Sequence, residues 1–289
     1  MCICFIILHY KKAEETVKCI KSILKIDGSD KMQILVVDNS AGDNSGQVVE
    51  ERYRDCKNVH ILFSEENAGF SRANNIGYRY ALSNFKPDFV VIANDDIEFC
   101  QEDFADRLIK IYERTHFAVL GPDVIHRITG SHQSPIDFRL RTEKEAQATI
   151  WKNRIALMLS GVLFPIGNLM LSRMNEKKES GLAIDYEKMH EDVVILGACL
   201  IFSRKFTECC ERAFDPETEF FYEEYILKCR CERLKLKMIY DPAIKVWHEG
   251  GASTWQSHKD RKKRLKFILY HTMKSCQIYL NYRREGQEG

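Results

Sequence analysis

Short apolar runs alternate with amphipathic segments through the first 125 residues, and this alternation restricts the fold more than any other feature of the chain. Runs rich in β-branched residues predict strands buried on both faces, at residues 3–8, 33–37, 59–63 and 89–93. Between them apolar residues recur at helical spacing, as in residues 13–24. Strands and helices that alternate in this way predict right-handed crossovers. We therefore expect an α/β fold with a Rossmann-like, mostly parallel central sheet flanked by helices.

The pattern is less regular beyond residue 116. Residues 117–120 predict a strand that stops at the Gly121-Pro122 pair, and two further strands are predicted at 193–202 and 237–240. A helix is expected to begin around residues 220–224, with Leu227, Cys231 and Leu234 on one face. We divide the chain into a first half, a variable and partly helical insertion, a second half of the same domain and a basic amphipathic tail, at residues 1–125, 126–192, 193–255 and 256–289.

Within the insertion, residues 155–166 form an apolar run. It is shorter than the roughly 20 residues that a membrane-spanning helix needs. The run is therefore either a buried element of the core or a surface that meets an apolar partner such as a membrane.

Polar residues follow several of the predicted strands directly. Asn94, Asp95 and Asp96 come after the strand at 89–93. Adjacent carboxylates repel each other and stay ionised most easily beside a cation, so a divalent metal is their natural partner. The structural alternative is a solvated turn.

Three further polar groups fall at strand ends or in the turns after them. They are Asp38-Asn39-Ser40, the turn and helix start at 67–77, and Glu223-Glu224 with His248 downstream. Because ligands bind at the carboxyl ends of the strands in such sheets, we expect these groups to lie near one another. Ser45 is expected to cap the helix that follows Asp38.

These segments carry a resemblance to a known family. The pieces VVDNS, ENAGFSRANNIG, NDD, GACLIFSRK, FDPETEFFYEE and IKVWHEGGAS occur in the same order as in the inverting family-2 glycosyltransferases of GT-A fold, and most resemble the rhamnosyltransferase-like enzymes of bacterial polysaccharide (capsule and O-antigen) assembly. The resemblance covers roughly residues 1–125 and 193–255. It implies transfer of a sugar from a nucleoside-diphosphate-sugar to a hydroxyl of a glycan or lipid-linked acceptor.

The resemblance also implies roles for individual residues. It assigns the nucleotide to Asp38, and we extend substrate binding to Asn39, Asn67, Gly69, Arg72, Asn75 and Asp95. Gly69 and Gly77 would let the backbone approach a phosphate at a helix N-terminus. Solvated surface positions are the alternative for Arg72, and a turn or cap for Asp38.

The metal would be Mn²⁺ or Mg²⁺. The resemblance assigns it to Asp96, with Asn94 in place of the family's first acid and His248 completing the shell. An Asn supplies an amide oxygen with less charge than a carboxylate, and an imidazole favours Mn²⁺. A purely structural histidine is the alternative for His248.

The catalytic base is assigned to Glu224, beside Glu223. The family has Asp at the position of Glu224 and a further Asp at the position of Ile226. A neighbouring carboxylate raises the pKa of one member of the pair, which suits a base that works near neutrality. Two solvated acids in the first turn of a helix are the alternative.

Composition indicates which partners and which cellular compartment to expect. The 43 basic and 42 acidic residues give a net charge of +1, so nothing global favours nucleic acid as a partner. Eleven cysteines without a CxxC pair indicate buried thiols in a reducing compartment. With no signal peptide or spanning helix predicted, we expect a cytoplasmic protein, with the basic run at 259–264 as a contact to the inner face of the cell membrane, a dimer interface or a solvated helix.

Two rival functions follow from the same residues. The departures at Glu224 and Ile226 suggest a non-catalytic nucleotide-sugar-binding or assembly subunit. Nucleotidyl transfer on a similar sheet is disfavoured, because no Gly-rich basic loop for a triphosphate follows Leu8.

Overall fold

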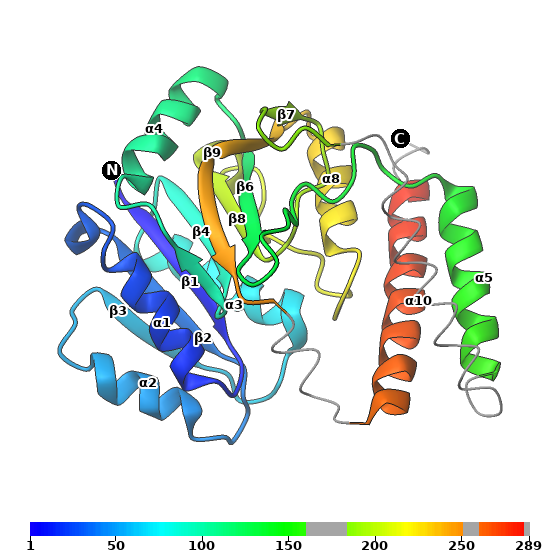
Figure 1. The fold of residues 1–289 in the computed structure, drawn as a ribbon, viewed down its shortest axis with the longest axis horizontal. Helices are drawn as coiled ribbons and strands as arrows, with labels where there is room; N and C mark the ends of the chain where they lie inside the picture. The colour runs from blue at the N-terminus through cyan, green and yellow to red at the C-terminus, as the bar shows by residue number, and fades with distance from the viewer. Residues whose placement is uncertain (160–183, 251–259, 286–289) are drawn as a thin grey trace.

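Four parallel strands form from the β-branched runs of the first 94 residues in the computed structural model of this protein (Figure 1). The structure describes residues 1–159, 184–250 and 260–285. The strands are β1 (Ile3–His9), β2 (Gln33–Asp38), β3 (Val59–Phe63), β4 (Phe89–Asn94), β5 (Ile97–Phe99), β6 (Val119–His126), β7 (His190–Glu191), β8 (Cys199–Ser203) and β9 (Met238–His248). The helices are α1 (Ala13–Ile23), α2 (Ser45–Tyr53), α3 (Gly69–Asn84), α4 (Phe104–Thr115), α5 (Glu143–Leu159), α7 (Arg204–Thr207), α8 (Glu223–Arg233) and α10 (Arg261–Glu285), with a short 3₁₀ turn at Ser29–Lys31.

The strands form one mixed sheet in the order β3-β2-β1-β4-β8-β6-β9-β5, with β7 paired to β9. The first four strands of this order are parallel, as predicted. Strand β8 lies antiparallel between β4 and β6, and β6 and β9 are again parallel. The antiparallel strand joins the two halves of the chain into one sheet.

Helices cover both faces of this sheet. Helices α1, α2 and α4 pack on one face, where residues such as Phe5, Val36 and Val91 point. Helices α3 and α8 pack on the other face, against residues such as Ile6 and Val37. Alternate residues of each strand therefore enter two separate cores, which explains why these strands are apolar throughout.

Two strands extend further than predicted. Strand β6 continues through Gly121-Pro122 to His126, and β9 continues through Asp241-Pro242 to His248. The prediction of a strand break at Gly121-Pro122 is therefore wrong. The register between β6 and β9 shifts between Pro122 and Asp123. An irregular ladder tolerates a proline, because no backbone N–H has to donate a hydrogen bond at that point.

Two other predictions need correction. Only Cys199–Ser203 of the expected strand at 193–202 is β-structure, since residues 193–198 pair only through the isolated bridge between Asp137 and Val194. In α8, Leu227 and Cys231 are buried as expected, but Leu234 follows the helix end and is exposed.

The insertion and the tail meet on one side of the domain. Helices α5 and α10 stand side by side in Figure 1, and α8 lies between α10 and the sheet. Tyr279 of α10 packs in a cluster with Tyr222, Tyr225 and Ile226. Part of the apolar run at 155–166, the last residues of the IKVWHEGGAS segment and the first residue of the basic run lie outside the described residues. No helix in the described part of the chain is long and apolar enough to cross a membrane.

Candidate active site

The predicted strand-end residues do converge at one edge of the sheet. Asp38 ends β2, Asn94 ends β4, and Asp95 and Asp96 follow in the turn to β5. Asp38, Asp95 and Asp96 are all buried. Three carboxylates therefore lie near the carboxyl ends of parallel strands, where ligands bind in such folds.

A histidine that the sequence analysis missed lies between two of these acids. His9 ends β1 and is fully buried. Its Nε2 is 3.9 Å from Asp38 Oδ1, and its Nδ1 is 4.0 Å from Asp95 Oδ2. Burial lowers the pKa of His9, although Asp38 and Asp43 oppose that shift. The available signal was its position directly after an apolar strand, the same position that marked Asp38 and Asn94.

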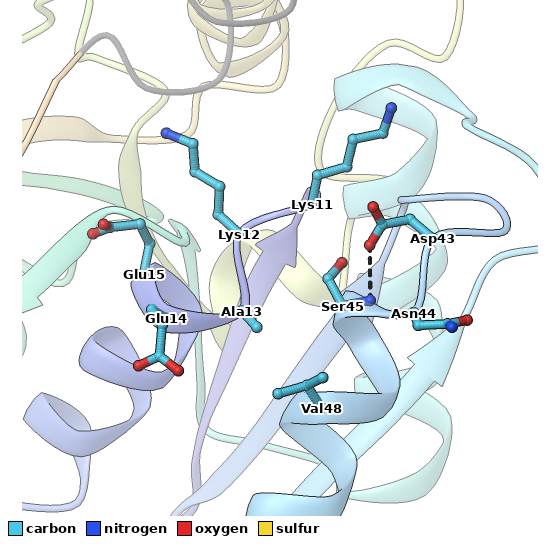
Figure 2. Close-up of a pocket in the computed structure, with 9 residues that line it drawn as sticks. All are labelled: Lys11, Lys12, Ala13, Glu14, Glu15, Asp43, Asn44, Ser45 and Val48. Carbon is cyan, nitrogen blue, oxygen red and sulfur yellow. Dashed lines mark hydrogen bonds between the residues drawn. The ribbon is translucent and has the colours of Figure 1, made fainter.

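His9 also ties two helix starts to the strand edge. Its Nδ1 lies 2.6 Å from Thr16 Oγ1 of α1, and its Nε2 lies 2.8 Å from Ser45 Oγ of α2. Ser45 therefore does not cap α2 as predicted, because its hydroxyl faces His9. Asp43 instead accepts a hydrogen bond at the start of α2, because its Oδ1 lies 2.7 Å from the Ser45 amide that donates to it (Figure 2).

A shallow hollow lies between these two helix starts, as Figure 2 shows. Lys11, Lys12 and Glu15 line it from the α1 side, and Asp43 and Ser45 line it from the α2 side. None of the catalytic, substrate-binding or metal-binding residues predicted from the sequence lines this hollow. It adjoins the Asp38 group through Ser40, whose hydroxyl accepts from the Lys11 amide at 2.9 Å.

Asn39 and Asn67 bind each other. Asn39 Nδ2 donates to Asn67 Oδ1 at 3.0 Å, and Asn39 Oδ1 accepts from the Ala68 amide at 2.8 Å. Asn67 Oδ1 also accepts from the amide of Gly69, the first residue of α3. These bonds fasten the end of β2 to the start of α3. Gly69 has φ +75°, which a residue with a side chain adopts only with strain.

Arg72 and Asn75 point toward the segment before α8. Arg72 Nε donates to the Pro216 carbonyl at 2.9 Å. The amide of Asn75 both donates to Phe214 O and accepts from Phe214 N, at 2.9 and 3.0 Å. The Asn75 side chain is also buried, so both ends of its amide serve the interior of the protein. The structure thus uses these two side chains to hold residues 214–216 against α3.

Gly77 serves helix–sheet packing. A Cβ at this position would lie 2.6 Å from Val37 Cγ2 and 2.8 Å from Ile6 Cγ2. Gly77 is in the third turn of α3, away from its N-terminus. The expectation that it brings backbone to a phosphate is therefore wrong, because its missing side chain is needed for contact with the sheet.

Asp96 and His248 face each other. Strand β9 pairs with β5 so that His248 lies opposite Ile97, and His248 Nε2 is 3.3 Å from Asp96 Oδ1. His248 Nδ1 lies 2.6 Å from Gln133 Oε1. With Gln133 Oε1 as the acceptor, Nδ1 carries the hydrogen, which leaves Nε2 on the side of Asp96 as a nitrogen that could bind a metal ion.

Two acceptors that face each other at 3.3 Å suit a shared cation. Two neighbouring ligands about 2.1 Å from one ion, at right angles, are about 3 Å apart, so the pair fits Mg²⁺ or Mn²⁺. In the described residues no three His, Cys, Asp or Glu side chains form a complete metal site. Asp96 and His248 alone would leave positions on such an ion for water or phosphate oxygens. Asn94 is half-buried at the end of β4 beside this pair.

Glu224 is linked to the same strand end. The Gly197 amide donates to Glu224 Oε1 at 3.2 Å, and the carbonyl of the next residue, Ala198, accepts from the Asn94 amide at 2.9 Å. Glu224 is half-buried in the first turn of α8. Gly197 and Ala198 therefore join Glu224, the candidate base, to Asn94 of the candidate metal motif, although Glu224 and Asn94 are distant in sequence.

Glu223 differs from Glu224 in its surroundings. Its side chain is buried, and no hydrogen-bond partner is found for its Oε2. Burial, with Glu224 as a second cause, holds the pKa of Glu223 well above its ordinary value. The raised pKa that the acid pair predicted therefore belongs to Glu223. Ile226 is fully buried in an apolar cluster, so in this chain the position belongs to the core and supplies no third acid.

The fold and the strand-end acids define the class of protein, an α/β domain with its polar site at the carboxyl ends of the strands. Residues 4–167, more than half of the chain, match the model of glycosyl transferase family 2. The chain therefore belongs to glycosyltransferase family 2.

Curated relatives match part of the chain. It is similar to the low-salt glycan biosynthesis hexosyltransferase Agl10 of Haloferax volcanii, with 31% identity over 122 residues that cover 42% of this chain and 36% of Agl10. It is also similar to glycosyltransferase GlyG of Streptococcus pneumoniae serotype 4, with 26% identity over 113 residues that cover 39% of this chain and 36% of GlyG. The match thus spans about a third of each relative.

Solved structures confirm the fold. S. aureus TarS 1–349 superposes with a TM-score of 0.55 at 14% identity, covering 86% of this chain and 60% of TarS 1–349. GalNAc-T7, solved with UDP, GalNAc and Mn²⁺, superposes with a TM-score of 0.56 at 11% identity, covering 85% of this chain and 43% of that one. Both are GT-A glycosyltransferases, so the GT-A fold predicted from the sequence is confirmed.

Proposed function

We propose that this protein is an inverting, metal-dependent glycosyltransferase that moves a sugar from a nucleoside-diphosphate-sugar to a hydroxyl of a glycan or lipid-linked acceptor. The observation that carries the proposal is the link from Glu224 through Gly197 and Ala198 to Asn94. It joins the Glu224 carboxylate to the end of β4, two residues before Asp96. A single displacement needs a base near the group that holds the leaving diphosphate, and this link supports that arrangement.

The reaction assigns one role to each group. Glu224 takes the proton of the acceptor hydroxyl as its oxygen attacks the anomeric carbon. The bond from that carbon to the diphosphate oxygen breaks, and the nucleoside diphosphate leaves with the electron pair. A divalent ion, when bound, would offset the charge of the leaving diphosphate. Asp96 and His248 would hold that ion, and Asp38 would accept hydrogen bonds from the nucleoside.

The structural neighbours support a nucleotide donor. TarS 1–349 has been solved with UDP, and that structure superposes on this chain with a TM-score of 0.50 at 14% identity. The GalNAc-T7 structure holds UDP and Mn²⁺ together. Because the superposition shows a shared fold alone, a UDP-sugar with Mn²⁺ is the first combination to test, ahead of GDP- and dTDP-sugars.

The rival function is a nucleotide-sugar-binding subunit without activity. The buried Ile226, where the resembling family has an acid, and the longer Glu224 favour it. Both functions predict donor binding, whereas only the enzyme predicts turnover.

The experiment compares wild-type protein with Glu224→Gln. Binding of UDP, GDP and dTDP with Mn²⁺ is measured by calorimetry, and transfer or hydrolysis is measured with the corresponding nucleotide-sugars. We expect Glu224→Gln to lose turnover by a factor of about 100 or more while nucleotide affinity changes little. Glu217→Gln, which alters an exposed acid on the segment before α8, is the matched control. Binding without any turnover in the wild type would favour the subunit, and no binding of any nucleotide would contradict both functions.

A further inference from the structure

The backbone directly before the acid pair is strained. Phe221 has φ +67° and Tyr222, the residue before Glu223, has φ +63°. Residues with a side chain rarely adopt this left-handed region, and two in succession persist only where their surroundings hold them. Whatever holds Tyr222 therefore determines where Glu223 and Glu224 begin α8.

Arg141 of the insertion holds Tyr222 directly. Its Nη1 donates to Tyr222 Oη at 2.9 Å and its Nε donates to Tyr225 Oη at 3.2 Å. The guanidinium also lies over both rings, 5.4 and 5.1 Å from their centroids. A planar, forked cation is suited to two such partners at once, and lysine cannot reproduce this contact.

The tail fixes Arg141 in turn. Tyr279 Oη and Arg283 Nη1 of α10 both donate to the Arg141 carbonyl, at 2.6 and 2.7 Å. The Tyr279 ring packs against the rings of Tyr222 and Tyr225, with centroids 5.6 and 5.9 Å apart. The backbone and the side chain of Arg141 are therefore both held.

The same network reaches the segment that binds Glu224. Tyr225 Oη donates to Asp137 Oδ2 at 3.0 Å, and the Val194 amide donates to the Asp137 carbonyl at 2.8 Å. Val194 lies three residues before Gly197, the partner of Glu224. The insertion thus holds both sides of the Gly197–Glu224 hydrogen bond.

We propose that Arg141 is a positioning residue for Glu224, and that the insertion and the tail act together to set the start of α8. This inference rests on the proposed function, since it takes Glu224 as the base. Arg141 touches no reacting atom and acts through Tyr222 and Tyr225. A displacement of about 1 Å in a catalytic group can reduce turnover about 100-fold, which makes such support necessary.

The test uses the full chain with Arg141→Ala, Arg141→Lys and Tyr222→Phe. We expect kcat to fall by a factor of about 100 in Arg141→Ala and by less in Arg141→Lys, with the Kd for UDP unchanged within about threefold. Tyr222→Phe keeps the ring and removes the hydroxyl, so it reports on the hydrogen bond should Arg141→Ala fail to fold.

Arg233→Ala is the matched control. Arg233 lies 4.2 Å from the Tyr282 ring centroid, so it also joins α8 to α10, but at the opposite end of α8 from the acid pair. We expect Arg233→Ala to keep kcat within about twofold even where it lowers the Tm. Unchanged kcat in folded Arg141→Ala and Tyr222→Phe, or an equal loss of kcat in Arg233→Ala, would overturn the proposal.

Hydrogen exchange separates this proposal from the proposed function. The Gly197 amide and the first turn of α8 should exchange faster in Arg141→Ala than in wild type or Arg233→Ala, whether or not the protein transfers sugar. Equal exchange in the two variants would show that Arg141 does not position Glu224. Absence of transfer in the wild type, with the exchange difference present, would count against the proposed function alone.

Discussion

Gly46 leaves the space that the Asp38 carboxylate occupies at the start of α2. A Cβ added to Gly46 would lie 2.0 Å from Asp38 Oδ2, which no real contact allows. The other carboxylate oxygen, Oδ1, accepts from the Ser40 amide at 2.9 Å. Helix α2 therefore needs a glycine at this position so that the Asp38 side chain can keep its place at the carboxyl end of β2.

Gly46→Ala should weaken donor binding through Asp38. Either Asp38 or α2 must shift, and loss of a hydrogen bond to a charged group corresponds to about a 10- to 100-fold loss of affinity. UDP titration by calorimetry measures the affinity, with Glu51→Gln, an exposed change on the same helix, as the control. In an Asp38→Ala background the change should add little, because both act on one contact. If the two substitutions instead reduced UDP affinity additively, Gly46→Ala would not act through Asp38.

Gln133→Leu should weaken metal binding. Gln133 Oε1 holds Nδ1 of His248, and removal of such an outer partner typically costs 10- to 100-fold in metal affinity. Mn²⁺ affinity is measured by electron paramagnetic resonance with UDP present, and His248→Ala should lose at least as much. Ser131→Ala, an exposed change in the same turn, is the control. Unchanged Mn²⁺ affinity in both variants would remove His248 from the proposed metal site.

Glu223→Gln should change how stability depends on pH. Burial raises the folded-state pKa of Glu223 above its ordinary value of 4.5, so the folded state binds more protons than the unfolded state in the window above that pH. The contribution of Glu223 to the free energy of unfolding therefore decreases as pH rises through this window. A glutamine does not titrate, so the Glu223→Gln variant lacks this decrease.

The free energy of unfolding of Glu223→Gln relative to wild type should thus increase from pH 5 upward, by at most about 1.4 kcal/mol per pH unit. Urea unfolding at several pH values measures the difference, with Glu217→Gln as the exposed control. A difference that stays constant with pH would mean that Glu223 is charged in the folded state at all these pH values.

Gly77→Ala should destabilise the fold. The new methyl group would overlap Val37 and Ile6, and overpacking of this kind costs about 1–3 kcal/mol. In a domain of this size the Tm should fall by roughly 2–4 °C for each kcal/mol, measured by circular dichroism. Val37→Ala in the same chain should recover part of the loss, because it removes one of the two overlapping groups. Strictly additive losses would contradict the packing explanation.

Local sequence pattern predicted the first half of the molecule well. The strands at 3–8, 33–37, 59–63 and 89–93 were predicted to within one residue of their observed ends. Runs of β-branched residues have a strong local signal because both faces of a central strand are buried. The same pattern brought Asp38 and Asp96 to one edge, since parallel strands end on the same side of a sheet.

The second half depended on pairing between distant segments. Strand β8 lies antiparallel between β4 and β6, and the local sequence of a strand does not specify its direction in the sheet. Strands β6 and β9 run through their prolines because the ladder between them is irregular at that point. The short runs around those prolines could not indicate this from the sequence.

The sequence by itself determined the alternating α/β domain and the polar residues at its strand ends, because strand and helix periodicity are local properties of the chain. Only the tertiary structure decided which residues support them. His9 lies near Asp38 and Asp95 because β1 pairs with both β2 and β4. Gln133 meets His248 because β6 and β9 pair. Arg141 and Tyr222, 81 residues apart, meet only because α8 and α10 pack against the insertion. Contacts of this kind arise from packing and leave no local pattern to read.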